Sequence, residues 1–132
     1  MITLGSRFLG AGLKPSSFAR LEYRGGVLTT QPAGPQIAER EATIISRKLN
    51  KAFAATGKRM KAFLLDLTNV QTVSGMGLGM CIDAHKRARD LGARTIVIGL
   101  SPQLEELFRV MKVDRMYKIA RTKSELSGLL AA

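Results

Sequence analysis

The chain holds one cysteine and one histidine, Cys81 and His85, which stand four residues apart in a segment predicted to be helical. Residues at this spacing share one face of a helix, and a thiol beside an imidazole is the pairing of a cysteine nucleophile. Such a nucleophile needs a stabilised thiolate in an open cleft, and a structural zinc site needs more ligands than these two. Leu78 and Ile82 flank the same face, which indicates that Cys81 and His85 belong to the core or its boundary.

The carboxylates of the chain offer no other route to catalysis. Asp66, Asp83 and Asp90 are spread along a predicted strand and a predicted helix, where they form no acid–base pair. The sequence therefore predicts a protein that is not an enzyme and that uses no metal and no cofactor.

A glycine-rich turn stands between that strand and that helix. Ser74, Gly75, Gly77 and Gly79 follow an apolar run that ends at Asp66, and the start of a helix leaves backbone N–H groups unpaired. The spacing GxGxG lacks the third glycine position of the dinucleotide fingerprint, and no GK[ST] follows it. The turn therefore does not predict a nucleotide site, and close packing of the helix on the sheet also explains its glycines.

At these residues the chain resembles the STAS family, the domain shared by anti-sigma factor antagonists and the tails of sulfate transporters. Family members have a strand ending near Asp-Leu, then Asp-Ser-Ser-Gly-Leu-Gly, then a helix that closes with a Lys/Arg-rich turn and Leu-Gly. Here the same order is Asp66-Leu67, then Ser-Gly-Met-Gly-Leu-Gly at 74–79, then a basic turn and Leu-Gly at 86–92. The resemblance covers roughly residues 20–130 and implies a mixed sheet with helices mainly on one face.

The resemblance also implies a partner and a modification. In the antagonists, the first serine of the motif is phosphorylated by the partner kinase, which is itself the anti-sigma factor. Gly75 takes the place of that serine here and Ser74 that of the preceding aspartate, while a register shifted by two residues puts Val73 at the acceptor position. Neither register supplies a hydroxyl, so we expect the usual phosphorylation switch to be lost. Ser74 is a substitute candidate for phosphorylation, although its position favours a helix cap.

One side of the predicted helix is left for a partner. At about 100° per residue, the side opposite the apolar face carries two methionines and three charged residues, namely Met76, Met80, Asp83, Arg87 and Asp90. Methionine suits adaptable binding surfaces, so we expect Met76 and Met80 near the surface, unless the N-terminal arm covers them. The predicted partner-binding residues are Val73, Ser74, Gly75, Met76, Gly77, Met80, Asp83 and Arg87.

The net charge of +11 over 132 residues is concentrated in two stretches, from Arg47 to Lys61 and from Arg109 to Lys123. Such a surplus suits an acidic protein, nucleic acid or an anionic membrane. Five Phe, two Tyr and no Trp supply no aromatic platform, so we expect no specific nucleic-acid binding. No apolar run approaches the ~20 residues of a membrane helix. One cysteine and the absence of a secretory pattern predict a cytoplasmic protein without membrane insertion.

Strands that alternate with helices predict a single α/β domain with a mixed sheet of about four or five strands and about four helices. We expect an irregular N-terminal arm over 1–17 and the STAS-like domain over 18–132. The turn Gly25-Gly26 predicts a hairpin between 18–23 and 27–30. Further strands are predicted over 63–67, 95–100 and 115–120. Helices are predicted over 36–55, 77–91 and 122–130. Another helix is predicted from residue 102, with Leu104, Leu107, Phe108 and Met111 facing inward.

Together these features predict a non-catalytic regulatory module that binds another protein. The resemblance implies that the partner is an anti-sigma factor of the histidine-kinase-like ATPase type. Two alternatives remain open, namely a STAS subunit of a lipid-transport or signalling assembly and a basic nucleic-acid-binding domain. The oligomeric state is left open as well.

Overall fold

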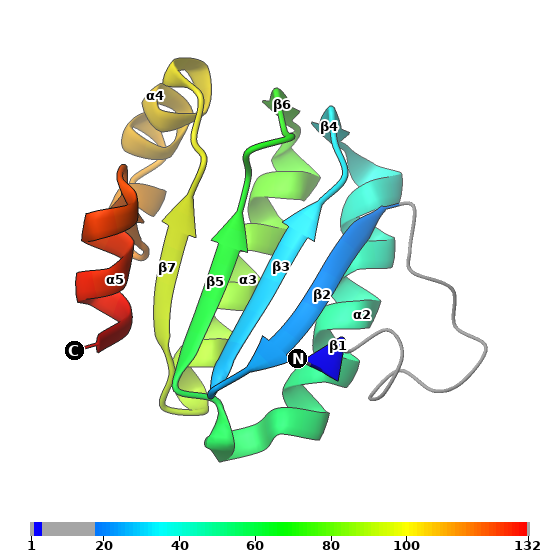
Figure 1. Cartoon of the computed structure of the whole chain (residues 1–132). Helices are drawn as coiled ribbons and strands as arrows, with labels where there is room; N and C mark the ends of the chain where they lie inside the picture. The colour runs from blue at the N-terminus through cyan, green and yellow to red at the C-terminus, as the bar shows by residue number, and fades with distance from the viewer. Residues whose placement is uncertain (1, 4–17, 132) are drawn as a thin grey trace.

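The computed structural model describes residues 2–3 and 18–131, which form a mixed β-sheet with helices on both of its faces (Figure 1). The strand order is β1-β2-β3-β5-β7-β8. The pairs β1–β2 and β2–β3 are antiparallel, and the pairs from β3 to β8 are parallel. The strands are β1 (Ile2–Thr3), β2 (Ala19–Arg24), β3 (Val27–Pro32), β5 (Ala62–Asp66), β7 (Arg94–Ile98) and β8 (Lys118–Ala120).

The predicted hairpin is present. Gly25 and Gly26 have φ values of 58° and 81°, and they connect β2 to β3 with Arg24 opposite Val27. Two successive residues with positive φ form the turn whose twist matches a two-residue hairpin, and glycine adopts this conformation at little cost. The glycine pair therefore sets the register of the two strands.

Among the described residues, α2 (Glu39–Thr56), α3 (Gly75–Asp90) and α4 (Pro102–Val110) cover one face of the sheet and α5 (Lys123–Ala131) covers part of the other (Figure 1). The first three share one buried apolar cluster with the strands. The last helix, α5, packs its leucines on Leu64, Ile96 and Ala120 of the opposite face. This arrangement confirms the predicted α/β fold and the placement of helices mainly on one face.

A second, two-stranded sheet lies beside the start of α3. In it, β4 (Gln36–Ile37) pairs in parallel with β6 (Thr72–Val73). The predicted helix over 36–55 is therefore wrong at its start, because α2 begins only at Glu39. The carbonyl of Pro35 accepts the N–H groups at positions 71 and 72, so hydrogen bonds from a distant segment hold this stretch extended.

Smaller differences have equally local causes. The helix predicted over 77–91 begins at Gly75, because Ser74 is its N-cap. The inward position predicted for Met111 is wrong, since α4 ends at Val110 and the Met111 side chain is 52% exposed. Within the predicted arm over 1–17, residues 2–3 form β1, and residues 4–17 lie outside the described part of the chain. The domain boundary at residue 18 stays a prediction.

Candidate functional site

The start of α3 is fixed by Ser74. Its Oγ accepts the N–H of Gly77 at 3.1 Å, its own N–H donates to the carbonyl of Ile37 at 2.9 Å, and its carbonyl accepts the N–H of Leu78 at 2.8 Å. A serine hydroxyl in this position satisfies one of the N–H groups that a helix start leaves unpaired. The capping role expected for Ser74 is therefore confirmed.

The three glycines of this first turn differ in what surrounds them. A β-carbon built on Gly77 would lie 2.2 Å from the carbonyl oxygen of Ile37, so close packing between α3 and β4 requires glycine there. A β-carbon built on Gly75 or Gly79 would have no atom of the described residues within 4 Å. Gly77 is thus explained by packing, whereas Gly75 and Gly79 leave bare backbone on an open surface.

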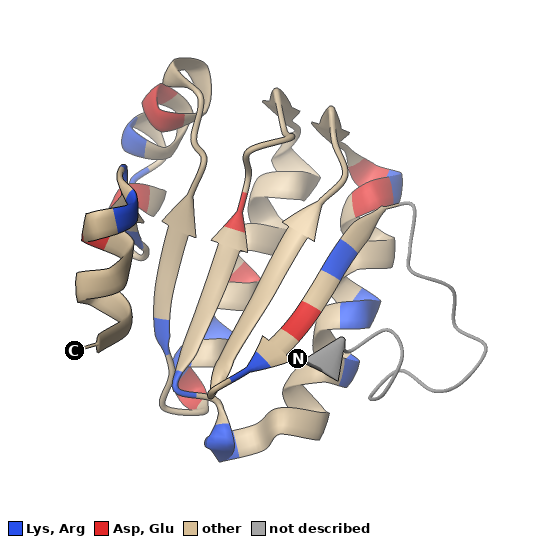
Figure 2. Ribbon diagram, viewed as in Figure 1, with Lys and Arg blue, Asp and Glu red and all other residues tan. Residues whose placement is uncertain are grey.

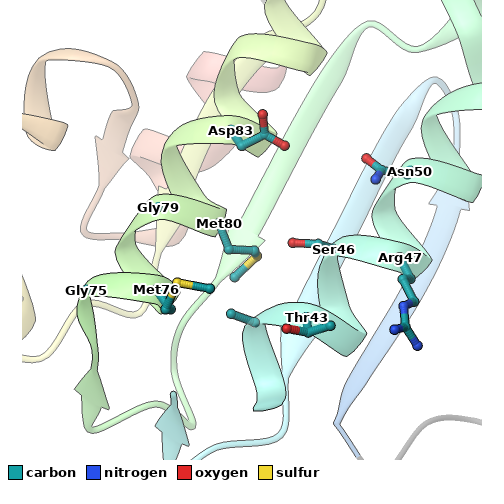
Figure 3. Close-up of a pocket in the computed structure, with 10 residues that line it drawn as sticks. Thr43, Ser46, Arg47, Asn50, Gly75, Met76, Gly79, Met80 and Asp83 are labelled. Carbon is teal, nitrogen blue, oxygen red and sulfur yellow. The ribbon is translucent and has the colours of Figure 1, made fainter. Parts of the chain in front are cut away.

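That open surface borders a groove between α2 and α3 with a volume of about 470 Å³. Met76, Gly79 and Met80 line it from α3, and Thr43, Ser46 and Asn50 line it from α2 (Figure 3). The two methionines differ in exposure, at 56% for Met76 and 5% for Met80. The expected surface position of Met80 is therefore wrong, because α2 covers it and leaves it as part of the groove floor. Met76 remains near the surface as predicted.

Charged side chains stand at the rim of the groove. Arg87 Nε donates to Asp83 Oδ2 at 2.8 Å, and about half of each side chain is exposed. Across the groove, Arg47 lies on the rim of α2, and its guanidinium points away from α3 (Figure 3). The pair on α3 is neutral as a unit, so the positive charge of this rim comes from α2.

The α2 wall of the groove was not among the residues predicted from the sequence. Thr43, Ser46 and Asn50 recur at helical spacing beside the core positions of α2, which is a readable pattern of small polar residues. Consecutive right-handed crossovers also place two helices side by side on a sheet. The polar pattern on α2 and the crossover rule together predict that α2 forms the second wall of the groove.

Cys81 and His85 lie in the core, as expected. Cys81 is fully buried, and burial raises the pKa of its thiol to about 12. His85 Nδ1 shares a hydrogen bond of 2.7 Å with Thr95 Oγ1, and burial followed by the nearby positive charges lowers its pKa. The Tyr117 hydroxyl donates to the carbonyl of Cys81 at 2.7 Å. A thiol so held stays protonated and does not act as a nucleophile at neutral pH.

The three aspartates singled out in the sequence bind different partners. Asp66 accepts hydrogen bonds from the Gln31 side chain and from Thr68 at the end of β5. Asp83 binds Arg87, and Asp90 lies 3.8 Å from Arg89. Over residues 2–3 and 18–131, no three residues of the types His, Cys, Asp or Glu are grouped so that they could hold a metal ion. Over the same residues, no helix combines the length and the apolar character needed to cross a bilayer.

The sequence profile of the STAS domain matches residues 19–126. The chain belongs to the STAS domain family. Among curated relatives, the anti-sigma-B factor antagonists of Listeria monocytogenes serovar 1/2a and Listeria innocua serovar 6a are each 30% identical over 64 residues. That match covers 48% of this chain, and the chain spans about half the length of these relatives, at 56% of each.

Solved STAS structures share the fold at lower identity. A putative anti-sigma factor antagonist from Thermotoga maritima has a TM-score of 0.73 at 18% identity, with 85% of this chain and 93% of that chain covered. A STAS domain protein from Planctomyces limnophilus has a TM-score of 0.72 at 19% identity, with 86% and 98% covered. The Bacillus cell fate determinant SpoIIAA in its phosphorylated form has a TM-score of 0.65 at 13% identity, with 84% and 98% covered. The architecture of this STAS domain is therefore that of the anti-sigma factor antagonists.

Proposed function

We propose that this STAS domain is a non-catalytic regulatory module that docks on another protein through the start of α3. The observation that carries the proposal is Met76, a large apolar side chain that is 56% exposed beside the bare backbone of Gly75 and Gly79. An apolar centre with a charged rim, here the Asp83–Arg87 pair, is the usual anatomy of a protein interface. The proposed docking surface comprises Val73, Ser74, Gly75, Met76, Gly77, Met80, Asp83 and Arg87.

The proposed partner is an anti-sigma factor of the kinase-like ATPase type, and the proposed place of binding is the cytoplasm. The names of the Listeria relatives support the partner class, since each is an anti-sigma-B factor antagonist. The core position of Cys81 supports the proposed cytoplasmic location, because a chain with one buried thiol needs no oxidising compartment to fold.

We propose that binding to this partner is not switched by phosphorylation of the family's usual serine. The resemblance puts either Gly75 or, in the register shifted by two residues, Val73 at the family's acceptor position, and neither side chain offers a hydroxyl. Ser74 is exposed and does carry one, but its Oγ already accepts the N–H of Gly77 as the helix cap. Phosphorylation at Ser74 would replace that cap with a dianion at the same helix start, and Ser74 is the one residue of the motif at 74–79 with a hydroxyl that a substitute switch would need.

The test is a titration of the purified protein with the kinase-like anti-sigma factors encoded in the same genome. We expect a one-to-one complex with at least one of them by calorimetry, and no loss of that complex after incubation with magnesium and ATP. Mass spectrometry of the incubated protein should find no phosphate between residues 70 and 80. Stoichiometric phosphate at Ser74 would contradict the lost switch, and failure of every such factor to bind at micromolar concentration would contradict the partner class.

A further inference from the structure

We infer that the groove between α2 and α3 receives an acidic segment of the protein partner that carries one apolar anchor side chain, so that α2 supplies half of the docking surface. The inference rests on the proposed function and deepens it, because it names the chemistry of the partner and adds a second wall to the surface.

The first observation is the shape of the groove. Its volume of about 470 Å³ falls in the range of ~300–1,000 Å³ typical of binding pockets. Met80 and Ala42 form an apolar floor and the half-exposed Met76 stands at its edge. The floor therefore suits an apolar side chain, while the hydroxyls and the amide on the α2 wall can bind the backbone beside it.

The second observation is the bare backbone of α3. An exposed glycine inside a helix is less favourable than alanine by ~1 kcal/mol, and no atom of the described residues lies within 4 Å of a β-carbon built on Gly79, so packing among them does not explain the glycine. The position leaves room for another molecule to approach the helix closely. Gly79 alone would be no site, but it lies on the wall of a groove whose floor and rim have their own chemistry.

The third observation is charge. From Ala42 to Leu65 the sequence has six Lys and Arg and no Asp or Glu, and three of the six lie on α2. Bands of positive charge follow α2 and the turn after it (Figure 2). Arg47, Lys48 and Lys51 form no ion pair with any described residue, whereas Asp83 is already neutralised by Arg87. Of the three cations only Arg47 lines the groove, and the two lysines add to the positive field of α2 around it. Acids do occur near the first turn of α2, at Glu39 and Glu41, so the attraction for an acidic segment is strongest along the later turns.

These observations favour an acidic protein segment over the other occupants. A second copy of this chain would bring the same net charge of +11 and meet electrostatic repulsion. Nucleic acid would satisfy the cations, but single strands are held by stacking their bases on aromatic side chains, and none of the described residues that line the groove is aromatic. A segment with one apolar side chain between acidic residues satisfies floor and rim together.

The test uses a displayed library of short random peptides, selected for binding to the full-length protein, so that its outcome does not depend on the anti-sigma factor. We expect the selected peptides to share one apolar residue flanked by Asp or Glu. Gly79→Leu should fill the groove and weaken their binding about tenfold or more, the effect of losing a central interface contact. The matched control is Gly128→Leu on α5, which also has open space around it and lies on the opposite face of the sheet.

A charge reversal keeps the test valid even if Gly79→Leu folds poorly. Arg47→Glu should weaken the same peptides several-fold, with a smaller loss at high salt, whereas Lys118→Glu on β8 should leave them unchanged. Selected peptides that are basic or neutral, or that bind equally well to Gly79→Leu and Arg47→Glu, would overturn the inference. Duplex DNA or single-stranded RNA whose binding is lost in Gly79→Leu would overturn it in favour of nucleic acid. A different result would count against the proposed function and leave this inference standing: the unsubstituted protein binds the selected peptides but none of the anti-sigma factors.

Discussion

The carbonyl oxygen of Ile37 lies against the α-carbon of Gly77, so that a β-carbon on this glycine would sit 2.2 Å from it. The side chains of Val73 and Ile37 would also lie within 3.0 Å of the added atom. The contact joins β4 to the first turn of α3 through main-chain atoms, which cannot rotate away as a side chain would. The start of α3 is therefore held in place by a contact that tolerates only glycine.

This contact predicts opposite effects of the same substitution at two neighbouring glycines. Gly77→Ala should lower the free energy of unfolding by ~1–3 kcal/mol, because the added methyl group overpacks a backbone contact. Gly79→Ala should raise it by up to ~1 kcal/mol, because alanine favours the helix and meets no neighbouring atom. Urea unfolding of both variants measures the two changes. Equal signs would show that α3 does not pack on β4 as described.

The hydroxyl of Ser74 should contribute to stability as a helix cap. Ser74→Ala should lower the free energy of unfolding by ~0.5–2 kcal/mol, whereas Ser74→Asp should keep most of it, because a carboxylate can accept the same N–H from Gly77. Denaturant unfolding at neutral pH measures both variants. A stable Ser74→Ala protein with reduced partner binding would instead point to a direct role of the hydroxyl at the interface.

Met76 should matter for binding more than for folding. Met76→Asp should weaken the complex with the protein partner by ~1–3 kcal/mol, the range of a moderate interface hot spot, and change stability by only ~0.5 kcal/mol. Calorimetric titration and thermal unfolding give the two numbers.

The control for Met76→Asp is Leu78→Asp, which should unfold the domain by placing a charge at a side chain that is 6% exposed. Leu78 serves better than Ile82, which the structure leaves only partly buried. A folded Met76→Asp protein that binds its partner at full strength would move the docking surface elsewhere.

The thiol of Cys81 should be inert in the folded protein. With a pKa of about 12 and no exposed surface, it should react with a disulfide reagent at pH 8 only as fast as the domain opens. In denaturant one thiol per chain should react at once. Rapid labelling without denaturant would show that the helix face carrying Cys81 is accessible.

His85 should make stability depend on pH. Its pKa is lower in the folded chain than the value of 6.5 expected for the unfolded chain, so the unfolded state binds the proton more readily. The contribution of neutral, buried His85 to the free energy of unfolding is therefore complete above pH 6.5, and it declines as the pH falls below that value. The unfolding midpoint of the native protein, compared with His85→Gln, should fall between pH 7 and pH 5.5. A relative gain in stability over this interval would contradict the assigned burial.

Local patterns predicted the elements that local physics controls. Ser74 and Ser101 each cap a helix through the N–H three residues later, as their positions before a helix suggested. The glycine pair at 25–26 formed the expected hairpin. Each of these features depends on groups only a few residues apart, so the sequence contains all the information needed for it.

The errors concern contacts between segments that are distant in sequence. The helical periodicity of 36–55 was correct from Glu39 onward, but the pairing of β4 with β6 depends on residues more than thirty positions away. A helical wheel placed Met80 beside Met76, yet it contains no information about the neighbouring helix that covers Met80. The groove was not predicted for the same reason, since its α2 wall is more than twenty residues away in sequence from the glycine-rich motif at 74–79.

The two walls of the groove are free to diverge at different rates. The start of α3 is tied to the fold by Gly77 and by the cap at Ser74, so substitutions at these two positions disturb the domain itself. On α2, Arg47 and Asn50 are exposed and form no hydrogen bond or ion pair with any described residue, so their replacement has little effect on folding. Paralogues would therefore acquire different partners through substitutions on α2 alone, while each keeps the same α3 wall. A few exposed residues on α2 would then limit the cross-talk between their pathways.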